Sequence, residues 1–150
     1  YYDRLLTILK QPVVRDGNWQ LLECAPGWDG NPTHDCFVAF GWQGIGDSRL
    51  VVAVNYASNQ SQCHIRLPFA GLAGKRWRIK DELSDASYDW NGDDLVGRGL
   101  FLDTGPWHAS VFSVIKSNSF EADLKKPLYR IVDRCEKWRE RQSIRVFCEF

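Results

Sequence analysis

The sequence predicts an all-β fold, an antiparallel Greek-key sandwich with a short N-terminal helix and a C-terminal amphipathic helix. Between about residues 19 and 115, short apolar runs alternate with turn residues, without helical patterns between them. In residues 19–24 and 62–67 the apolar positions tend to alternate, as expected for strands with one buried face. Short strands at this spacing are typical of a sandwich or a barrel.

The candidate strands share a short apolar run bounded by turn residues, and they are 19–24, 36–42, 49–56, 62–67, 76–81, 88–90, 99–103 and 109–115. Residues 50–54 are continuously apolar, so this strand should be central in a sheet. Asn91-Gly92 is the strongest short hairpin signal, because both residues tolerate the positive φ of a type I′ turn. It predicts a hairpin between residues 88–90 and 93–95.

Helical spacing is found only near the two ends. Apolar residues at positions 1, 5, 6, 8 and 9 predict an amphipathic helix, which Pro12 prevents from continuing. Apolar residues at positions 124, 128, 131, 135 and 138 predict a second one, with Lys and Arg on its other face over residues 126–142. We therefore expect a linking helix in residues 1–12, a sandwich in 13–117 and a helical tail in 118–150.

Composition narrows the possible partners. The 150 residues include 19 basic and 19 acidic side chains, so net charge gives no attraction to nucleic acid or to an anionic membrane. No apolar run approaches the length of a membrane span. The five cysteines are odd in number and form no close pair, which favours reduced thiols and a cytoplasmic location. The chain contains no methionine, which we interpret as a piece of a longer protein.

The acidic residues cluster in turn-like sequence, and they are Asp81, Glu82, Asp85, Asp89, Asp93 and Asp94. Glycoside hydrolysis needs two carboxyl groups flanking a sugar, but a solvated turn cluster explains these residues better. Asp89, Asn91 and Asp93 alternate like the start of a calcium loop, yet the later Gly and Glu of such a loop are missing. We expect no catalytic residue, no cofactor and no metal site in this chain.

Histidine and glycine give no site either. His34, His64 and His108 have no ligand spacing, and His108 is expected to be structural. Gly41, Gly44 and Gly46 precede a strand and not a helix, so they belong to a hairpin connection and not to a phosphate-binding loop.

The chain contains seven tryptophans, a number that is compatible with an aromatic binding surface. Trp19 and Trp77 fit strands and are expected in the core. Trp28 lies in the loop Pro26-Gly27-Trp28-Asp29-Gly30 and is the best single candidate for a ligand or interdomain contact. Trp90 and Trp107 are further candidates for carbohydrate or interdomain contact.

One stretch is more specific than these patterns. Residues 77–85 read WRIKDELSD, 88–95 read YDWNGDDL, 99–103 read GLFLD and 106–112 read PWHASVF. This series resembles the C-terminal β-domain of the α-amylase family of glycoside hydrolases. Residues 37–40 (FVAF) and 50–55 (LVVAVN) resemble earlier strands of the same domain, so the resemblance covers about residues 1–115. Gly41 and Ser110 depart from the pattern, where the family often has Arg and His.

The resemblance implies an accessory role. In that family the catalytic carboxylates lie on a (β/α)₈ barrel of about 250 residues, which this chain cannot contain. We therefore expect no catalytic residue here, and a non-catalytic module that packs on the parent's barrel through its first helix and loop aromatics such as Trp28. The parent would be a glycosidase or a glucosyltransferase. Alternatives are a module that binds α-glucan through exposed tryptophans, and self-association through residues 126–142.

Overall fold

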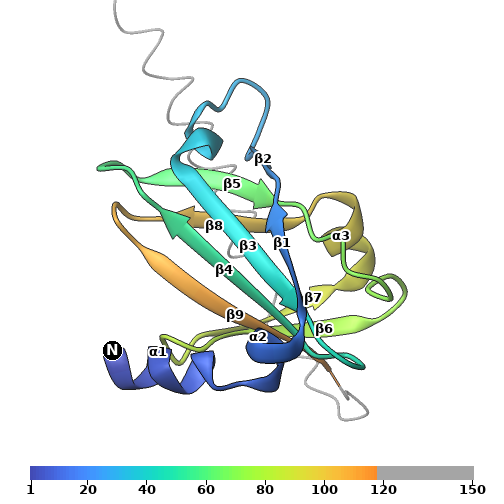
Figure 1. Cartoon of the computed structure of the whole chain (residues 1–150). Helices are drawn as coiled ribbons and strands as arrows, with labels where there is room; N and C mark the ends of the chain where they lie inside the picture. Colours follow the sequence, from blue (N-terminus) through green and yellow to red (C-terminus); the bar gives the residue numbers. More distant parts are fainter. Residues whose placement is uncertain (118–150) are drawn as a thin grey trace, which may run out of the picture. The chain divides into compact units, whose positions relative to one another are not determined.

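The computed structural model describes residues 1–117, which form two antiparallel β-sheets packed face to face (Figure 1). The all-β sandwich predicted from the sequence is therefore confirmed, as is its short N-terminal helix. The Greek-key connection stays a prediction. Cys135, Cys148 and Trp138, the helix over 126–142 and the remaining tail lie outside the described residues.

The larger sheet has six strands in the order β1-β3-β4-β9-β6-β7. Their bounds are β1 Asn18–Leu22, β3 Phe37–Gln43, β4 Arg49–Asn55, β9 Ala109–Lys116, β6 Arg76–Asp81 and β7 Ser87–Asn91. The β4 strand lies between β3 and β9, which confirms the central position predicted from its continuous apolar run. A turn closed by a bond from Gly44 N to Ser48 O joins β3 to β4, so Gly44 and Gly46 belong to a hairpin connection as predicted, whereas Gly41 lies within β3.

The smaller sheet has three strands in the order β2-β5-β8, with bounds Cys24–Pro26, Ser61–Ile65 and Leu100–Thr104. The single strand predicted over residues 19–24 is therefore wrong. The chain changes sheets at Glu23, so β1 pairs with β3 and β2 pairs with β5. Corners of this kind allow one continuous segment to contribute to both layers of a sandwich.

The main core fills the space between the two sheets. Its largest buried side chain is Trp77, which is 0% exposed and donates from Nε1 to the carbonyl of Leu72 at 2.8 Å. The other buried apolar residues from the larger sheet include Leu22, Phe37, Ala39, Val51, Ala53, Ile79, Phe112 and Val114. The smaller sheet contributes Cys63, Ile65, Leu100 and Leu102. The core position predicted for Trp77 is confirmed.

The N-terminal helices cover part of the outer face of the larger sheet (Figure 1). The helix α1 spans Tyr2–Leu9 and buries Ile8, and α2 spans Pro12–Asp16 and buries Val13. These two side chains form a second cluster with Leu50 and Val111. The sequence pattern did not predict α2, because Pro12 does end the first helix but also starts the next one at a position where its missing N–H is not needed.

The hairpin predicted at Asn91-Gly92 is wrong. Asn91 instead caps the short helix α3, Gly92–Gly97, and its side chain accepts a bond from the backbone N–H of Asp93 at 3.1 Å. Asparagine is a favoured N-cap as well as a favoured turn residue, so the dipeptide alone did not distinguish the two outcomes. A 3₁₀ turn over Thr33–Cys36 completes the described elements.

Asn55, fully buried at the end of β4, ties the sheets together. Its side-chain amide donates to the carbonyls of Asn59, Thr104 and Gly105, and its oxygen accepts from the N–H of Ala57. Four bonds satisfy this side chain, as a buried polar group requires. Within residues 1–117, the structure contains no helix long and apolar enough to cross a membrane.

Candidate functional site

A groove opens at one edge of the smaller sheet, with a volume of about 320 Å³. It is lined by the end of β2 and the loop after it, by β5 and the residue that follows it, and by the end of α3. The lining side chains that carry chemistry are Trp28, Asp29, His64, Arg66 and Arg98. Three segments that are distant in the sequence thus meet around one small hollow.

The two arginines are held by the backbone around them. Arg66 donates from Nη1 to the carbonyl of Gly97 at 2.8 Å, and its own N–H bonds the carbonyl of Glu23 at 2.9 Å. Arg98 ends α3, where its N–H bonds the carbonyl of Asp94 at 2.8 Å. Both arginines are exposed at the rim, so their charges face solvent and any ligand in the groove.

Gly99 fixes how closely α3 approaches β5. Its φ is +90°, a value favourable only for glycine, and a Cβ at this position would lie 2.4 Å from the carbonyl oxygen of Ile65. A glycine here therefore allows the end of α3, with Gly97 and Arg98, to lie directly beside Arg66.

His64 is half-buried between the groove and the ring of Phe101, whose centre lies 5.1 Å away. Burial lowers the pKa of this imidazole, and the charges of Arg66 and Arg98 lower it further, while backbone carbonyls of Gly27 and Gly99 act in the opposite direction. The neutral imidazole is therefore favoured, and it offers one donor and one acceptor. With His64 neutral, the lining carries two positive charges and one negative charge.

The lining of the groove does not contain the carboxylate pair of a glycosidase. Asp29 is the one carboxylate among the lining residues, whereas glycosidases use a pair of them. Among residues 1–117, no three His, Cys, Asp or Glu side chains gather closely enough to hold a metal ion.

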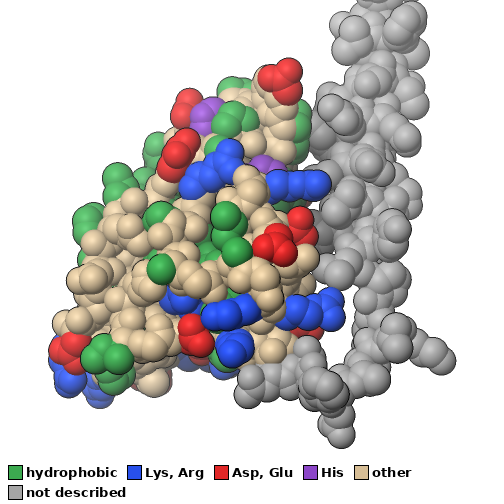
Figure 2. Space-filling view, turned by 90° about the vertical axis from the view of Figure 1, so that its right-hand side faces the viewer, with side chains coloured by type: hydrophobic (Ala, Val, Ile, Leu, Met, Phe, Trp, Pro, Cys, Tyr) green, Lys and Arg blue, Asp and Glu red, His purple; other side chains and the backbone are tan. Residues whose placement is uncertain are grey.

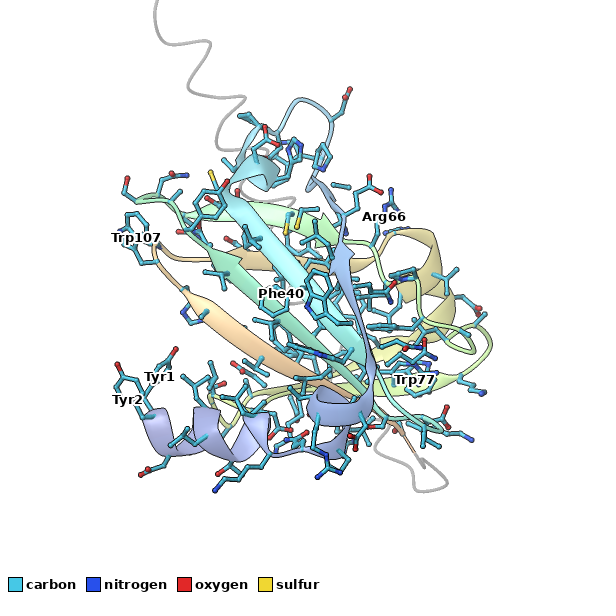
Figure 3. The ribbon with its side chains drawn as sticks, in the orientation of Figure 1. Tyr1, Tyr2, Phe40, Arg66, Trp77 and Trp107 are labelled. Carbon is cyan, nitrogen blue, oxygen red and sulfur yellow. The ribbon has the colours of Figure 1, made fainter. Side chains whose placement is uncertain are left out.

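The structure separates the three tryptophans that the sequence singled out. Trp28 lines the groove, and Trp90 lies on β7, half-buried against the core. Trp107 is 70% exposed with φ +55°, and its N–H bonds the carbonyl of Ala57 at 3.1 Å. It lies on the opposite side of the sandwich from Arg66 (Figure 3). The three do not form one aromatic surface.

The acidic cluster has structural roles. The buried carboxylate of Asp81 accepts bonds from the N–H groups of Leu83 and Val111 and from the hydroxyl of Ser84, so it fastens the β6–β7 turn to β9. Arg4 of α1 donates to the carbonyl of Leu83 on the same turn. The β6–β7 turn, one part of the stretch that carried the family resemblance, therefore contacts the N-terminal helix.

The alternating acidic residues that suggested calcium are engaged separately. Asp89 pairs with Arg78 at 3.1 Å, and Asp93 accepts a bond from the N–H of Gly74 at 2.9 Å. Asn91 is the N-cap of α3. Their polar atoms are thus directed to three different partners instead of one shared centre.

A second feature, the outer apolar face, was not predicted from the sequence. We define it as Trp19 and Leu21 of β1 with Val38 and Phe40 of β3. Trp19 is 57% exposed and Leu21 is 67% exposed, so the core position predicted for Trp19 is wrong. The alternation of β1 was recognised, but Gln20 and Leu22 point inward and Trp19 points outward.

The outer apolar face is continuous. Leu21 lies opposite Phe40 in the register of β1 and β3, and the rings of Trp19 and Phe40 lie 6.4 Å apart. The ring of Phe40 also meets that of Trp42 edge to face at 5.5 Å, which leads toward the cluster under α1 and α2. In Figure 3, Phe40 marks this face on the front of the larger sheet.

Comparison with known proteins supports the fold. No protein-family model matches the chain, and no curated protein matches it in sequence. Among solved structures, the chain is similar to the galactosidase domain of alpha-galactosidase-sucrose kinase, AgaSK, with a TM-score of 0.51 and 18% sequence identity. The match covers 77% of this chain and 15% of that one, so the chain spans a small part of its structural neighbour. The two share a β-domain fold.

Proposed function

We propose that this chain is a non-catalytic β-domain of a glycoside hydrolase or glucosyltransferase of the α-amylase type, and that it packs on the catalytic barrel of its parent. The observation that carries the proposal is the outer apolar face. An exposed cluster of large apolar side chains on a folded domain commonly marks an interaction site.

The position of this face favours a partner within the same polypeptide. The helix α1 covers the neighbouring part of the same sheet face, and Tyr2, Leu6 and Leu9 remain exposed on it. A domain reached through α1 would meet the exposed side of this helix and the outer apolar face together. The interface would then bury both groups of apolar side chains.

The kind of partner follows from two further observations. The fold is shared with part of a galactosidase polypeptide. The sequence of residues 77–112 resembles the C-terminal domain of α-amylase-type enzymes. The acidic residues that could serve hydrolysis are engaged in structural bonds, as shown for Asp81, Asp89 and Asp93. We therefore favour a role in which this domain stabilises the catalytic barrel over a role in catalysis.

The test compares the 150-residue chain with the whole parent enzyme. Leu21→Asp and Val38→Asp place charges on the outer apolar face, and Val96→Asp on α3, which is 52% exposed, is the matched control. We expect the two face variants to lower the Tm of the parent by at least about 2 °C while leaving the isolated chain nearly unchanged. Val96→Asp should change neither protein.

Two results would contradict the proposal. The first is an equal effect of the face variants in the chain and in the parent, because the face would then be part of this domain's own stability. The second is hydrolysis of maltooligosaccharides by the pure chain that is lost on Asp89→Asn or Asp93→Asn.

The groove beside Trp28 supports a second candidate, a module that binds α-glucan through tryptophans. It predicts that the chain is retarded in gels containing amylose and that Trp28→Ala removes the retardation. Trp90→Ala and Trp107→Ala report whether the other two aromatic side chains contribute. Equal mobility with and without amylose would reject this candidate.

A further inference from the structure

The groove differs from a neutral sugar site in its charge. Arg66 and Arg98 lie on its rim, and both line the same hollow as His64. Asp29 is the one opposing carboxylate in the lining. Figure 2 shows this side of the domain, where Lys and Arg side chains lie beside histidine in the upper half.

The Arg66 side chain is anchored before any ligand arrives, whereas Arg98 is placed by its backbone at the end of α3. One guanidinium nitrogen of Arg66 is held by the carbonyl of Gly97, which leaves its other N–H groups to bond elsewhere. Arg98 follows Gly97 directly, so the two cations are carried by neighbouring stretches of backbone. A guanidinium presents parallel donors that match a carboxylate, sulfate or phosphate group.

The remaining lining suits a ring with hydroxyl groups. The indole of Trp28 supplies an apolar surface, and the carboxylate of Asp29 supplies acceptors. The volume of about 320 Å³ is near the lower end of the range of small-molecule sites, which corresponds to a ligand of one or two sugar rings.

The geometry points to a binding site for an acidic saccharide, with its anionic group between Arg66 and Arg98 and its ring against Trp28. This inference does not depend on the packing of the domain on a barrel, because the groove lies on the smaller sheet and the outer apolar face on the larger one. It also differs from α-glucan binding, since a neutral glucan carries no group for the two arginines.

The test is titration calorimetry of the 150-residue chain with four probes: glucuronate, glucose 6-phosphate, maltose and inorganic phosphate. We expect one or both acidic sugars to bind at least about tenfold more tightly than maltose, as a charge-assisted pair of hydrogen bonds implies. We also expect them to bind more tightly than inorganic phosphate, which has no ring for Trp28. The two acidic sugars distinguish a carboxylate site from a phosphate site.

Variants then assign the contacts. Arg98→Gln should weaken acidic-sugar binding about tenfold, and Trp28→Ala about threefold or more. Arg66→Gln should have the effect of Arg98→Gln, with Tm measured because Arg66 also holds α3. Arg15→Gln, an exposed arginine paired with Asp16 on α2, is the matched control and should change nothing.

Four results would overturn the inference. They are no acidic-sugar binding up to about 10 mM; maltose binding equal to that of the acidic sugars; inorganic phosphate binding equal to theirs; and unchanged affinity in a folded Arg98→Gln variant. The second result would support the α-glucan alternative instead. None of these results affects the proposed packing on a barrel, which is tested separately by the Tm values of the outer-face variants.

Discussion

The guanidinium carbon of Arg49 lies 4.7 Å from the centre of the ring of Trp77. Both side chains are buried, and Arg49 donates to the carbonyl of Ala70 and pairs with Asp47 at 3.5 Å. A buried cation is costly without such partners. The start of β4 is therefore joined to β6 and to the loop before it by one charged side chain.

This contact gives the first prediction. Arg49→Met keeps much of the apolar stem but removes the charge and the bond to Ala70, so the free energy of unfolding should fall by about 2–3 kcal/mol. Urea unfolding followed by circular dichroism measures the change. Arg15→Met on α2 is the control and should change the value by less than about 0.5 kcal/mol. Equal midpoints for the two variants would mean that the Arg49–Trp77 contact contributes little.

The fold class was predictable because the strands carry local signals. The apolar run of residues 50–54 predicted a central strand, and β4 is central. The face of each strand that is buried was harder to predict. In β1 the sequence shows alternating apolar residues. Whether the face with Trp19 or the face with Leu22 is buried depends on which face of the larger sheet packs on the smaller sheet. The tertiary structure decides that, and the local pattern does not contain it.

The groove was less predictable. Trp28 was found because an aromatic residue in a glycine-rich loop is a recognisable signal. Arg66, Arg98 and His64 were missed, because they come from β5, the segment after it and α3, and no spacing along the chain brings them together. The outer apolar face did have a signal. Trp19 and Leu21 are alternate residues of β1, and Val38 and Phe40 are alternate residues of β3, so each pair lies on one face of its strand. Large apolar residues at alternate positions of two neighbouring strands are therefore the signal that could have found this face.

The second prediction concerns the thiols of Cys24 and Cys63, which hydrogen-bond across β2 and β5. The thiol of Cys63 donates to that of Cys24, which lowers the pKa of Cys24 and raises that of Cys63. Because the thiolate is the reactive form, the bond from Cys63 should make Cys24 react faster with an alkylating agent than it would without that bond. Cys63→Ala removes the donor and should slow alkylation of Cys24, whereas Cys63→Ser retains a hydroxyl donor and should slow it less.

Iodoacetamide labelling resolved by peptide mass spectrometry measures the Cys24 rate separately from the other cysteines. Circular dichroism shows whether each variant keeps its fold. Equal rates of Cys24 alkylation in the unmodified 150-residue chain and in the Cys63→Ala variant would show that the hydrogen bond does not control this thiol.

The third prediction is a pH dependence of stability from His64. Burial lowers its pKa in the folded chain below the ordinary value of 6.5, so the unfolded chain binds more protons between the two values. The contribution of His64 to stability is therefore present above about pH 6.5 and is lost as the pH falls. His64→Gln should flatten this part of the curve of unfolding free energy against pH. His108→Gln, at an exposed position, should not, and a curve unchanged by His64→Gln would contradict the prediction.

The fourth prediction tests how Gly99 shapes the groove. Gly99→Ala combines an unfavourable positive φ with a Cβ 2.4 Å from the carbonyl oxygen of Ile65, so α3 must move away from β5. We expect a loss of about 1–3 kcal/mol in the free energy of unfolding, measured by urea denaturation. Gly97→Ala is the control, since a Cβ there meets nothing within 4 Å. It lies within α3, where alanine is favoured, and should be neutral or stabilising. If the two variants unfold at the same urea concentration, the backbone at Gly99 is not what holds Arg98 beside Arg66.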